Sequence, residues 1–147
     1  MALELTRYGR DEREICSVEA AGAADVDRAV EAARAAFEHG SPWREMAGTE
    51  RGALMLRLAD LVERRAADLA TLETWDNGKP YAEAAGSDLP EVLSTLRYYA
   101  GWADKVHGQT IPTSVQKLAY TLKEPLGVCG QIIPVGAASA RAGWHVV

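Results

Sequence analysis

The hydrophobic period of the sequence changes near Gly108, and this change limits the possible folds of the chain. Before it, apolar residues recur at spacings of three and four, which is the pattern of amphipathic helices. After it, residues 110–114 and 117–122 alternate like the two strands of a hairpin. The short apolar run 128–134 is typical of a strand that is buried on both faces of a sheet. The sequence therefore predicts helices, then a hairpin, then one buried strand.

Polar caps and glycine stops divide the helical part into four predicted helices. Asp25, Thr49 and Asp68 are placed to cap helix amino ends, and Asp88 with Glu91 resembles a capping box. Glycine adopts the left-handed conformation that ends many helices, and Gly40, Gly78 and Gly108 stand at the expected ends. Residues 1–22 have no clean period and are expected to be extended or loose. The predicted helices lie within residues 25–39, 49–67, 68–77 and 88–107.

The predicted helices carry apolar stripes that should face the core. The stripe of the second helix is Leu54, Leu58, Leu61 and Val62, with Arg51, Arg57 and Arg64 directed away from it. The stripe of the fourth helix is Val92, Leu96, Ala100 and Ala103. A set of aromatic residues has helical spacing, which favours packing between helices over a substrate funnel. That set is Trp75, Tyr98, Tyr99 and Trp102.

The net charge and the hydropathy of the chain argue against several classes of binding partner. The formal net charge of -5 and the pI of about 5.2 argue against nucleic acid or an anionic membrane surface. The sequence has no uninterrupted apolar run of about 18 residues, so no segment is predicted to span a membrane. No signal peptide is visible at the amino end, and the expected location is the cytoplasm, with a matrix-like compartment reached by a presequence as the alternative.

The two cysteines, Cys16 and Cys129, are far apart and form no cluster with each other or with the three histidines. Neither a disulfide framework nor a metal site is predicted. An activated thiol needs an electropositive and partly exposed environment. Because Cys129 lies within the apolar run, we expect a buried structural thiol there and no catalytic nucleophile.

Four segments, taken in order, resemble the NAD(P)-dependent aldehyde dehydrogenase family. The clearest is Glu-Thr-Trp-Asp-Asn-Gly-Lys-Pro at residues 73–80, beside the family's Glu-Thr-x-Asp-Asn-Gly-Lys-Pro. The resemblance covers residues 14–134 without a break, which makes it more specific than one short motif. The other three segments are 24–37, 96–105 and 124–134.

The resemblance implies an α/β fold with a Rossmann-type cofactor domain, of which this chain would hold the N-terminal helices, the hairpin arm that joins subunits, and the first strand. It also implies the oxidation of an aldehyde to a carboxylic acid, with NAD or NADP as hydride acceptor, through a cysteine thiolate and an oxyanion held by an asparagine. Ile132, Ile133 and Pro134 match positions beside the nicotinamide. Read from their residue types alone, these three are ordinary core strand.

The catalytic residues of the family do not match positions of this chain. The family follows Ile-Ile-Pro with Trp-Asn-Phe-Pro, whereas Pro134 is followed here by Val-Gly-Ala-Ala, and residues 135–147 depart from the family pattern. We therefore read residues 1–147 as a single incomplete N-terminal region with no catalytic residue. A reading-frame change is one explanation, and a shift of one or two bases after Pro134 should then restore Trp-Asn-Phe-Pro.

Three functional hypotheses follow. The chain is part of an aldehyde-oxidising enzyme; or it is an interaction module, which self-associates or docks its hairpin at 109–123 onto a full-length subunit by adding to a sheet edge; or it is a truncated product without a function of its own.

Overall fold

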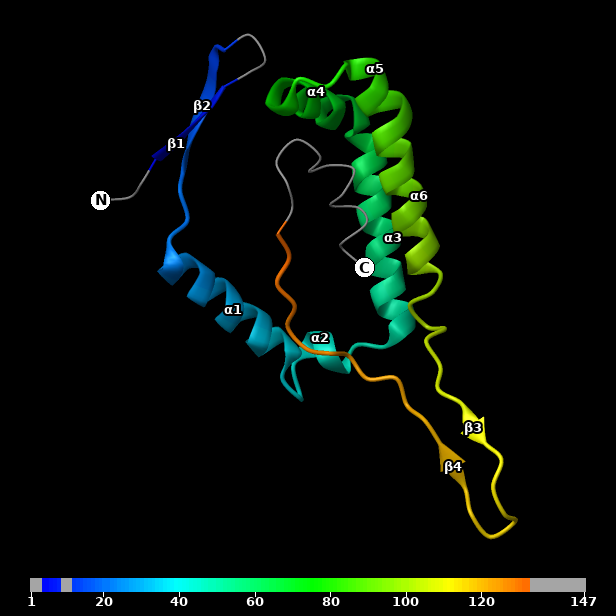
Figure 1. The fold of residues 1–147 in the computed structure, drawn as a ribbon. Helices are drawn as coiled ribbons and strands as arrows, with labels where there is room; N and C mark the ends of the chain where they lie inside the picture. The colour runs from blue at the N-terminus through cyan, green and yellow to red at the C-terminus, as the bar shows by residue number, and fades with distance from the viewer. Residues whose placement is uncertain (1–3, 9–11, 133–147) are drawn as a thin grey trace.

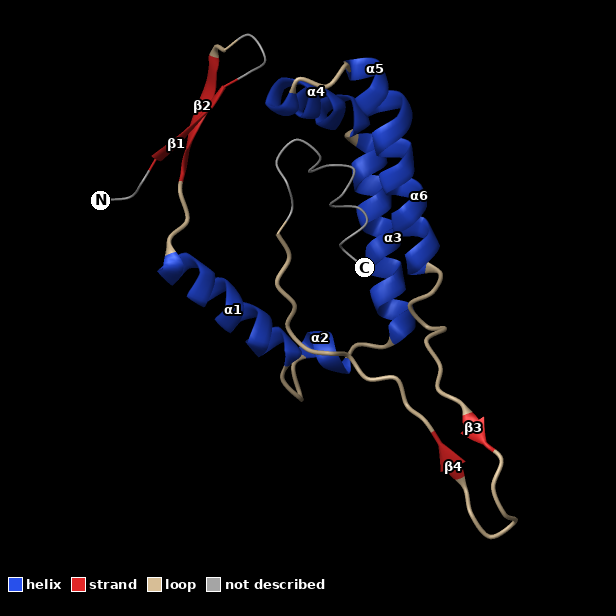
Figure 2. Ribbon diagram, in the orientation of Figure 1, coloured by secondary structure: helices blue, strands red, loops and turns tan. Residues whose placement is uncertain are grey.

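The computed structural model describes residues 4–8 and 12–132, and these are mostly helical with two small hairpins (Figures 1 and 2). Ile133, Pro134 and residues 135–147 lie outside the described residues. The elements, in order, are β1 (Glu4–Tyr8), β2 (Glu14–Glu19), α1 (Ala23–Phe37), α2 (Pro42–Glu45), α3 (Gly48–Arg64), α4 (Ala66–Asn77), α5 (Tyr81–Glu83), the π-helical turn η1 (Ala84–Asp88), α6 (Leu89–Ala100), β3 (Thr110–Ile111) and β4 (Ala119–Tyr120).

The core lies between α3 and α6, which run side by side, and continues to α4 and η1 at one end of the pair (Figure 1). One cluster of buried residues joins α3 to α6: Ala59, Val92 and Leu96. A second joins α4, η1 and the start of α6: Ala70, Ala84 and Leu89. The prediction that Val92, Leu96 and Ala100 face the core is confirmed, with exposed fractions of 6%, 2% and 7%.

The predicted core stripe of α3 is wrong in its main part. Leu54, Leu58 and Leu61 are exposed, whereas Gly52 and Ala59 are buried. A Cβ atom added at Gly52 would lie 2.7 Å from the carbonyl oxygen of Ala100. The two helices are therefore too close for a large side chain at this crossing, and the small-residue face of α3 packs against α6 in place of the leucine face.

Two predicted helix starts are displaced because the capping group comes from within the first turn. The helix α1 begins at Ala23, where the backbone N–H of Gly22 donates to the Asp25 carboxylate at 2.8 Å. Similarly α3 begins at Gly48 and not after Thr49, and the N–H of Ala47 donates to Glu50 at 3.0 Å. In both cases an acidic side chain three residues inside the helix binds the N-cap backbone.

The predicted fourth helix ends earlier than expected, and at its amino end η1 leads into it without a break. Asp88 is not a cap, since its φ of −62° and ψ of −50° continue the helix from η1 into α6. The helix ends at Ala100, and a series of turns follows through Asp104, so the predicted extension to His107 is wrong. The glycine stop at Gly78 is confirmed, with the residue in the left-handed region at φ 76°.

The two hairpins and the run at 128–132 show that a strand pattern forms a strand only where a second strand pairs with it. The predicted hairpin is confirmed by the pairing of Thr110 with Tyr120 and Ile111 with Ala119. Residues 1–22 were predicted only as extended or loose, and β1 pairs antiparallel with β2 there. The run from 128 to 132 forms no strand, and Ile132 is fully exposed. A buried strand requires neighbouring strands for its backbone groups, and the described residues provide none beside it.

Candidate functional site

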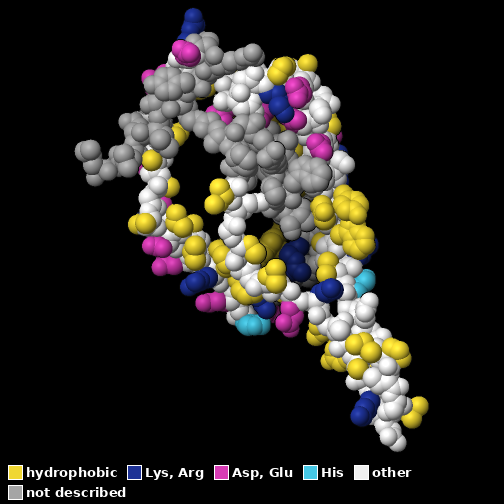
Figure 3. Space-filling model, in the orientation of Figure 1, with side chains coloured by type: hydrophobic (Ala, Val, Ile, Leu, Met, Phe, Trp, Pro, Cys, Tyr) yellow, Lys and Arg dark blue, Asp and Glu magenta, His cyan; other side chains and the backbone are white. Residues whose placement is uncertain are grey.

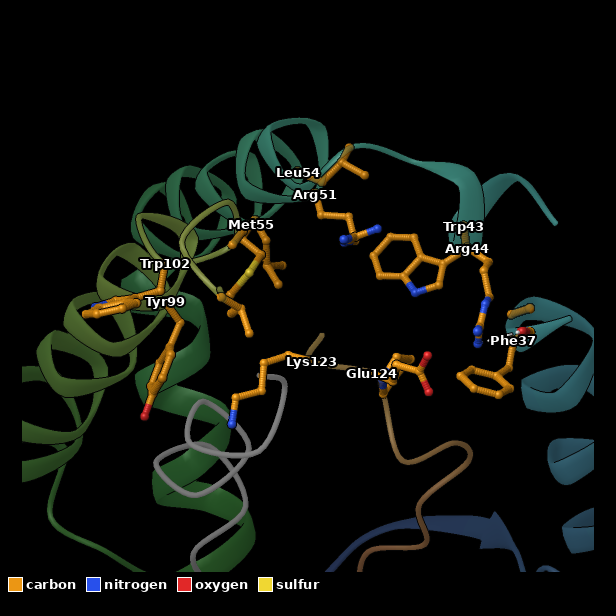
Figure 4. Close-up of a pocket in the computed structure, with 15 residues that line it drawn as sticks. Phe37, Trp43, Arg44, Arg51, Leu54, Met55, Tyr99, Trp102, Lys123 and Glu124 are labelled. Carbon is orange, nitrogen blue, oxygen red and sulfur yellow. Dashed lines mark hydrogen bonds between the residues drawn. The ribbon is translucent and has the colours of Figure 1, made fainter. Parts of the chain in front are cut away.

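A pocket of about 890 Å³ opens between α1–α2, α3, the end of α6 and residues 123–125 (Figure 4). Its walls are mostly apolar, and several of its large side chains are substantially exposed. Those are Trp43, Leu54, Leu58, Tyr99, Trp102 and Val106. The leucine spacing on α3 predicts an apolar face in the core, whereas in the structure Leu54 and Leu58 line this pocket, which the sequence does not predict.

Two arginines that line the pocket, Arg44 and Arg51, donate hydrogen bonds to backbone carbonyl groups where α1, α2 and α3 meet. The guanidinium carbon of Arg44 lies 4.2 Å from the centroid of the Phe37 ring, and its Nη1 donates to the Phe37 carbonyl oxygen at 3.3 Å (Figure 4). Arg51 donates to the carbonyl oxygen of Met46. Arg51 is half-buried, so the prediction that it faces away into solvent is wrong. These cations hold the α1–α2–α3 corner together.

The aromatic residues predicted to pack between helices are instead exposed. Trp75, Tyr98, Tyr99 and Trp102 are exposed by 40% or more. Tyr98 stacks edge-to-face with Tyr99 at 5.1 Å and lies 6.3 Å from Trp102. Tyr99 and Trp102 line the pocket. Helical spacing shows which residues share a face of a helix, but it does not show whether another element packs against that face.

A buried carboxylate lies outside the pocket, where α4 ends and α6 begins. Asp88 is 7% exposed, and its Oδ2 accepts from the Lys79 ammonium at 2.6 Å. Glu83 lies 3.7 Å from the same ammonium, and the backbone N–H of Lys79 donates to Asn77 Oδ1 at 2.7 Å. The hydrogen bond to Asp88 is the largest cause of the raised pKa of Lys79, and the charges of Asp88 and Glu83 add to it. This network ties the left-handed stop at Gly78 to the first turn of α6.

The predicted cofactor residues are not gathered into a site by the described part of the chain. Ile132 is fully exposed and does not line the pocket. Cys129 is exposed, so the prediction of a buried thiol is wrong; its Sγ lies 3.7 Å from the carbonyl oxygen of Gly127. Within residues 4–8 and 12–132, no three His, Cys, Asp or Glu side chains come together to hold a metal.

Comparison with known proteins identifies the family. The family model described as "Aldehyde dehydrogenase family" matches residues 6–147, a range that includes the tail at 135–147. The chain belongs to the aldehyde dehydrogenase family, and the resemblance found in the sequence is confirmed.

Individual relatives support this and show how much of them the chain covers. It is 62% identical to mitochondrial aldehyde dehydrogenase of Equus caballus over 82% of this chain and 24% of that protein. It is 51% identical to retinal dehydrogenase 2 of Homo sapiens over 90% of this chain and 26% of that protein. The chain thus spans about a quarter of the length of these relatives.

The fold agrees with the N-terminal part of solved structures. The structure of an aldehyde dehydrogenase from Bacillus cereus, described as a complex with NAD+, matches with a TM-score of 0.94 and 45% identity. The match covers 98% of this chain and 29% of that one. Among the described residues, no helix is both long and apolar enough to cross a membrane.

Proposed function

We propose that this chain forms the N-terminal part of an enzyme subunit that oxidises an aldehyde to a carboxylic acid, with NAD or NADP as the hydride acceptor. The observation that carries the proposal is the match to the NAD+-complexed Bacillus cereus enzyme at a TM-score of 0.94 and 45% identity. Within such a subunit the helices α3 to α6 supply a packed unit, and residues 126–134 supply the first strand of the α/β cofactor domain.

The cofactor role of Ile132, Ile133 and Pro134 depends on that strand. An apolar run that lies in coil and exposes Ile132 becomes a strand when neighbouring strands satisfy its backbone groups. Pairing would place the three residues at the carboxyl end of a strand of the cofactor sheet, and ligands of α/β folds bind at the carboxyl ends of the strands. We expect them to line the nicotinamide side of the site only in the assembled subunit.

The chain by itself should not turn over aldehydes. The reaction needs a thiolate nucleophile, an oxyanion donor and a base, and the family's residues for these have no matching positions in this sequence. In 1–147 alone we expect no NAD(P)-dependent oxidation of acetaldehyde, hexanal or benzaldehyde, and no calorimetric heat of NAD binding.

A chimera tests the proposal directly. The chain, up to Pro134, replaces the matching segment of the Bacillus cereus enzyme, and NADH formation is measured with the same aldehydes. The proposal predicts a folded, active chimera. A folded chimera that binds no NAD+ would show that this segment does not belong to such an enzyme.

A second candidate function is an interaction module, and the hairpin β3–β4 favours it. The hairpin projects from the body of the molecule, and several apolar side chains lie on its surface (Figures 1 and 3). Val115 is fully exposed, and Leu118 and Leu122 are exposed by 79% and 70%. Such a patch is unusual on a monomer. In this alternative the chain self-associates or binds a full-length subunit, and light scattering at micromolar concentration should detect a species larger than one chain.

The cellular location stays a prediction. We expect the cytoplasm from the sequence, while several of the relatives are named mitochondrial enzymes.

A further inference from the structure

The base of the β3–β4 hairpin is closed by a contact that only glycine allows. A Cβ atom added at Gly108 would lie 1.6 Å from the carbonyl oxygen of Thr121 and 2.5 Å from its carbonyl carbon, distances that real Cβ atoms do not reach. The φ angle of Gly108 is not in the left-handed region. Glycine is therefore required here by the close approach of two backbones and not by an unusual backbone conformation.

Hydrogen bonds extend this contact along the hairpin. The backbone N–H of Thr121 donates to the carbonyl oxygen of Gln109 at 2.9 Å, and the N–H of Gln109 donates to the Thr121 hydroxyl at 2.9 Å. At the tip, the N–H of Lys117 donates to the carbonyl oxygen of Ser114 at 3.0 Å, and the Lys117 carbonyl accepts from the Thr113 hydroxyl at 2.6 Å. The hairpin is thus tied at its base and at its tip, with the β3–β4 pairs between them.

Both legs of the hairpin are held by the body of the molecule (Figure 1). On the first leg, a Cβ atom added at Gly48 would lie 2.5 Å from the carbonyl oxygen of Ala103, so the backbone that follows α6 lies directly on the start of α3. On the second leg, residues 123–125 line the pocket beside α2 and α3, and a Cβ added at Gly127 would lie 4.0 Å from the Phe37 ring. The hairpin therefore leaves the body from two supported points.

We propose that Gly108 is a positioning residue, which closes the base of the hairpin and so fixes the direction in which the hairpin projects before any partner binds. The exposed side chains of Val115, Leu118 and Leu122 are then held in one place relative to α3. A contact element that is ordered in advance loses less conformational freedom on association. The inference rests on the interaction function proposed above and adds to it the residue that orients the interacting element.

A side chain at residue 108 should change the direction of the hairpin. In Gly108→Ala the Thr121 carbonyl oxygen must move from 1.6 Å to at least 3.0 Å from the new Cβ atom. Paired strands lie only about 4.8 Å apart, and the tip lies about 20 Å from the base at the usual rise per residue. A displacement at the base is therefore amplified, and the tip should move by on the order of 5 Å.

Two spin labels measure this movement in the full chain. The exposed Cys16 and Cys129 are replaced by serine, and labels are attached through Arg57→Cys on α3 and Gln116→Cys at the hairpin tip, both at exposed positions. Double electron–electron resonance is recorded with excess unlabelled chain, so that only distances within one chain contribute. The proposal predicts one narrow distance distribution in the parent chain and a shift or broadening on the order of 5 Å in Gly108→Ala. A broad distribution in the parent, or an unchanged one in Gly108→Ala, overturns it.

Gly130→Ala is the matched control, because an added Cβ there meets no atom within 4 Å and the residue lies outside the hairpin. It should leave the distance distribution unchanged, and equal effects of the two alanine variants would exclude Gly108 as the positioning residue. Thr121→Val removes the hydroxyl that accepts from Gln109 without adding a steric overlap. It should broaden the distribution less than Gly108→Ala, and it decides the question if Gly108→Ala loses its helical circular dichroism, since no broadening in Thr121→Val would then overturn the proposal.

Light scattering on the same samples separates this proposal from the interaction function. If the distribution is narrow and responds to Gly108→Ala while the chain stays monomeric, the positioning role stands and the interaction function fails. If the chain self-associates although the hairpin samples a broad range of distances, the interaction function stands and the positioning role is wrong.

Discussion

The helical unit from α3 to α6 and the elements on either side of it use similar local patterns with different results. Among the described residues, the buried apolar side chains all lie between Ala59 and Ala100. The helix α1 is regular over Ala23–Phe37 and yet buries no residue. Every residue of β2 is exposed, as are both residues of β3.

A local hydrophobic pattern specifies a helix or a strand, whereas burial of its apolar side chains also needs a second surface to pack against. The small-residue face of α3 and the apolar stripe of α6 meet within the described residues, so Ala59, Val92 and Leu96 leave water. On α1, Val26, Ala29 and Ala33 also recur at helical spacing, yet Val26 stays 58% exposed. We expect the free energy of unfolding to be concentrated in the α3–α6 unit, and five predictions test this contrast.

The largest effect is expected at Leu96, the most buried large side chain. Leu96→Ala should lower the free energy of unfolding in urea by about 3 kcal/mol, since it removes buried methyl groups and leaves a cavity. Leu118→Ala on the hairpin, where the side chain is 79% exposed, should cost less than about 0.5 kcal/mol. Similar losses in the free energy of unfolding for the two variants would show that the hairpin packs into the same core as Leu96.

The next effect concerns the ion pair that joins α4 to α6. Lys79→Met leaves the Asp88 carboxylate buried without its ammonium partner and should cost about 2 kcal/mol. The matched control is Lys105→Met, where the pair with Asp104 is exposed and the change in urea stability should be near zero.

The pH dependence of this pair has a definite sign. Because the folded pKa of Lys79 is raised, its contribution is present below the ordinary lysine pKa and is lost as the pH rises through the folded value. Stability of the parent chain should therefore fall on alkaline titration above about pH 10, and this fall should be weaker in Lys79→Met.

A smaller effect is expected at the crossing of α3 and α6. In Gly52→Ala the new Cβ meets the Ala100 carbonyl oxygen at 2.7 Å, so the helices must separate. The strain is partly offset by the better helix propensity of alanine, and the net loss should be about 1 kcal/mol. Gly86 has no atom within 4 Å of its added Cβ, so Gly86→Ala should not destabilise the chain in thermal unfolding.

The smallest effect concerns the exposed pairs of Arg97. Its Nη2 lies 2.6 Å from Glu63 and 3.5 Å from Asp60, and the hydrogen bond and charge of Arg97 lower the pKa of Glu63. The stability this provides is present above the ordinary glutamate pKa and is lost as the pH falls through the lowered value, below about pH 4. Glu63→Gln should remove a small, salt-sensitive part of the acid transition, and added salt should remove the same part in the parent chain.

The local elements and the family can be predicted from the amino-acid sequence. Left-handed glycine at Gly40 and Gly78 and the β3–β4 pairing follow from contacts within one segment, and the spacing of Val92, Leu96 and Ala100 follows from the period of the helix. Glu73 to Pro80 and the three other matching segments identified the aldehyde dehydrogenase family before any fold was known. Helix caps, turns and short hairpins can be predicted from the sequence because they are stabilised by contacts within one segment.

Which apolar surface is covered depends on contacts between helices that are far apart in the sequence. The leucines of α3 form the stronger apolar pattern, but the glycine and alanine face is buried because it alone allows α6 to approach within backbone contact. Asp88 pairs with Lys79 nine residues away because η1 carries the helix through the predicted cap. The run that ends in Ile132, Ile133 and Pro134 is coil as far as it is described, because a buried strand is stabilised by neighbouring strands and not by its own residues.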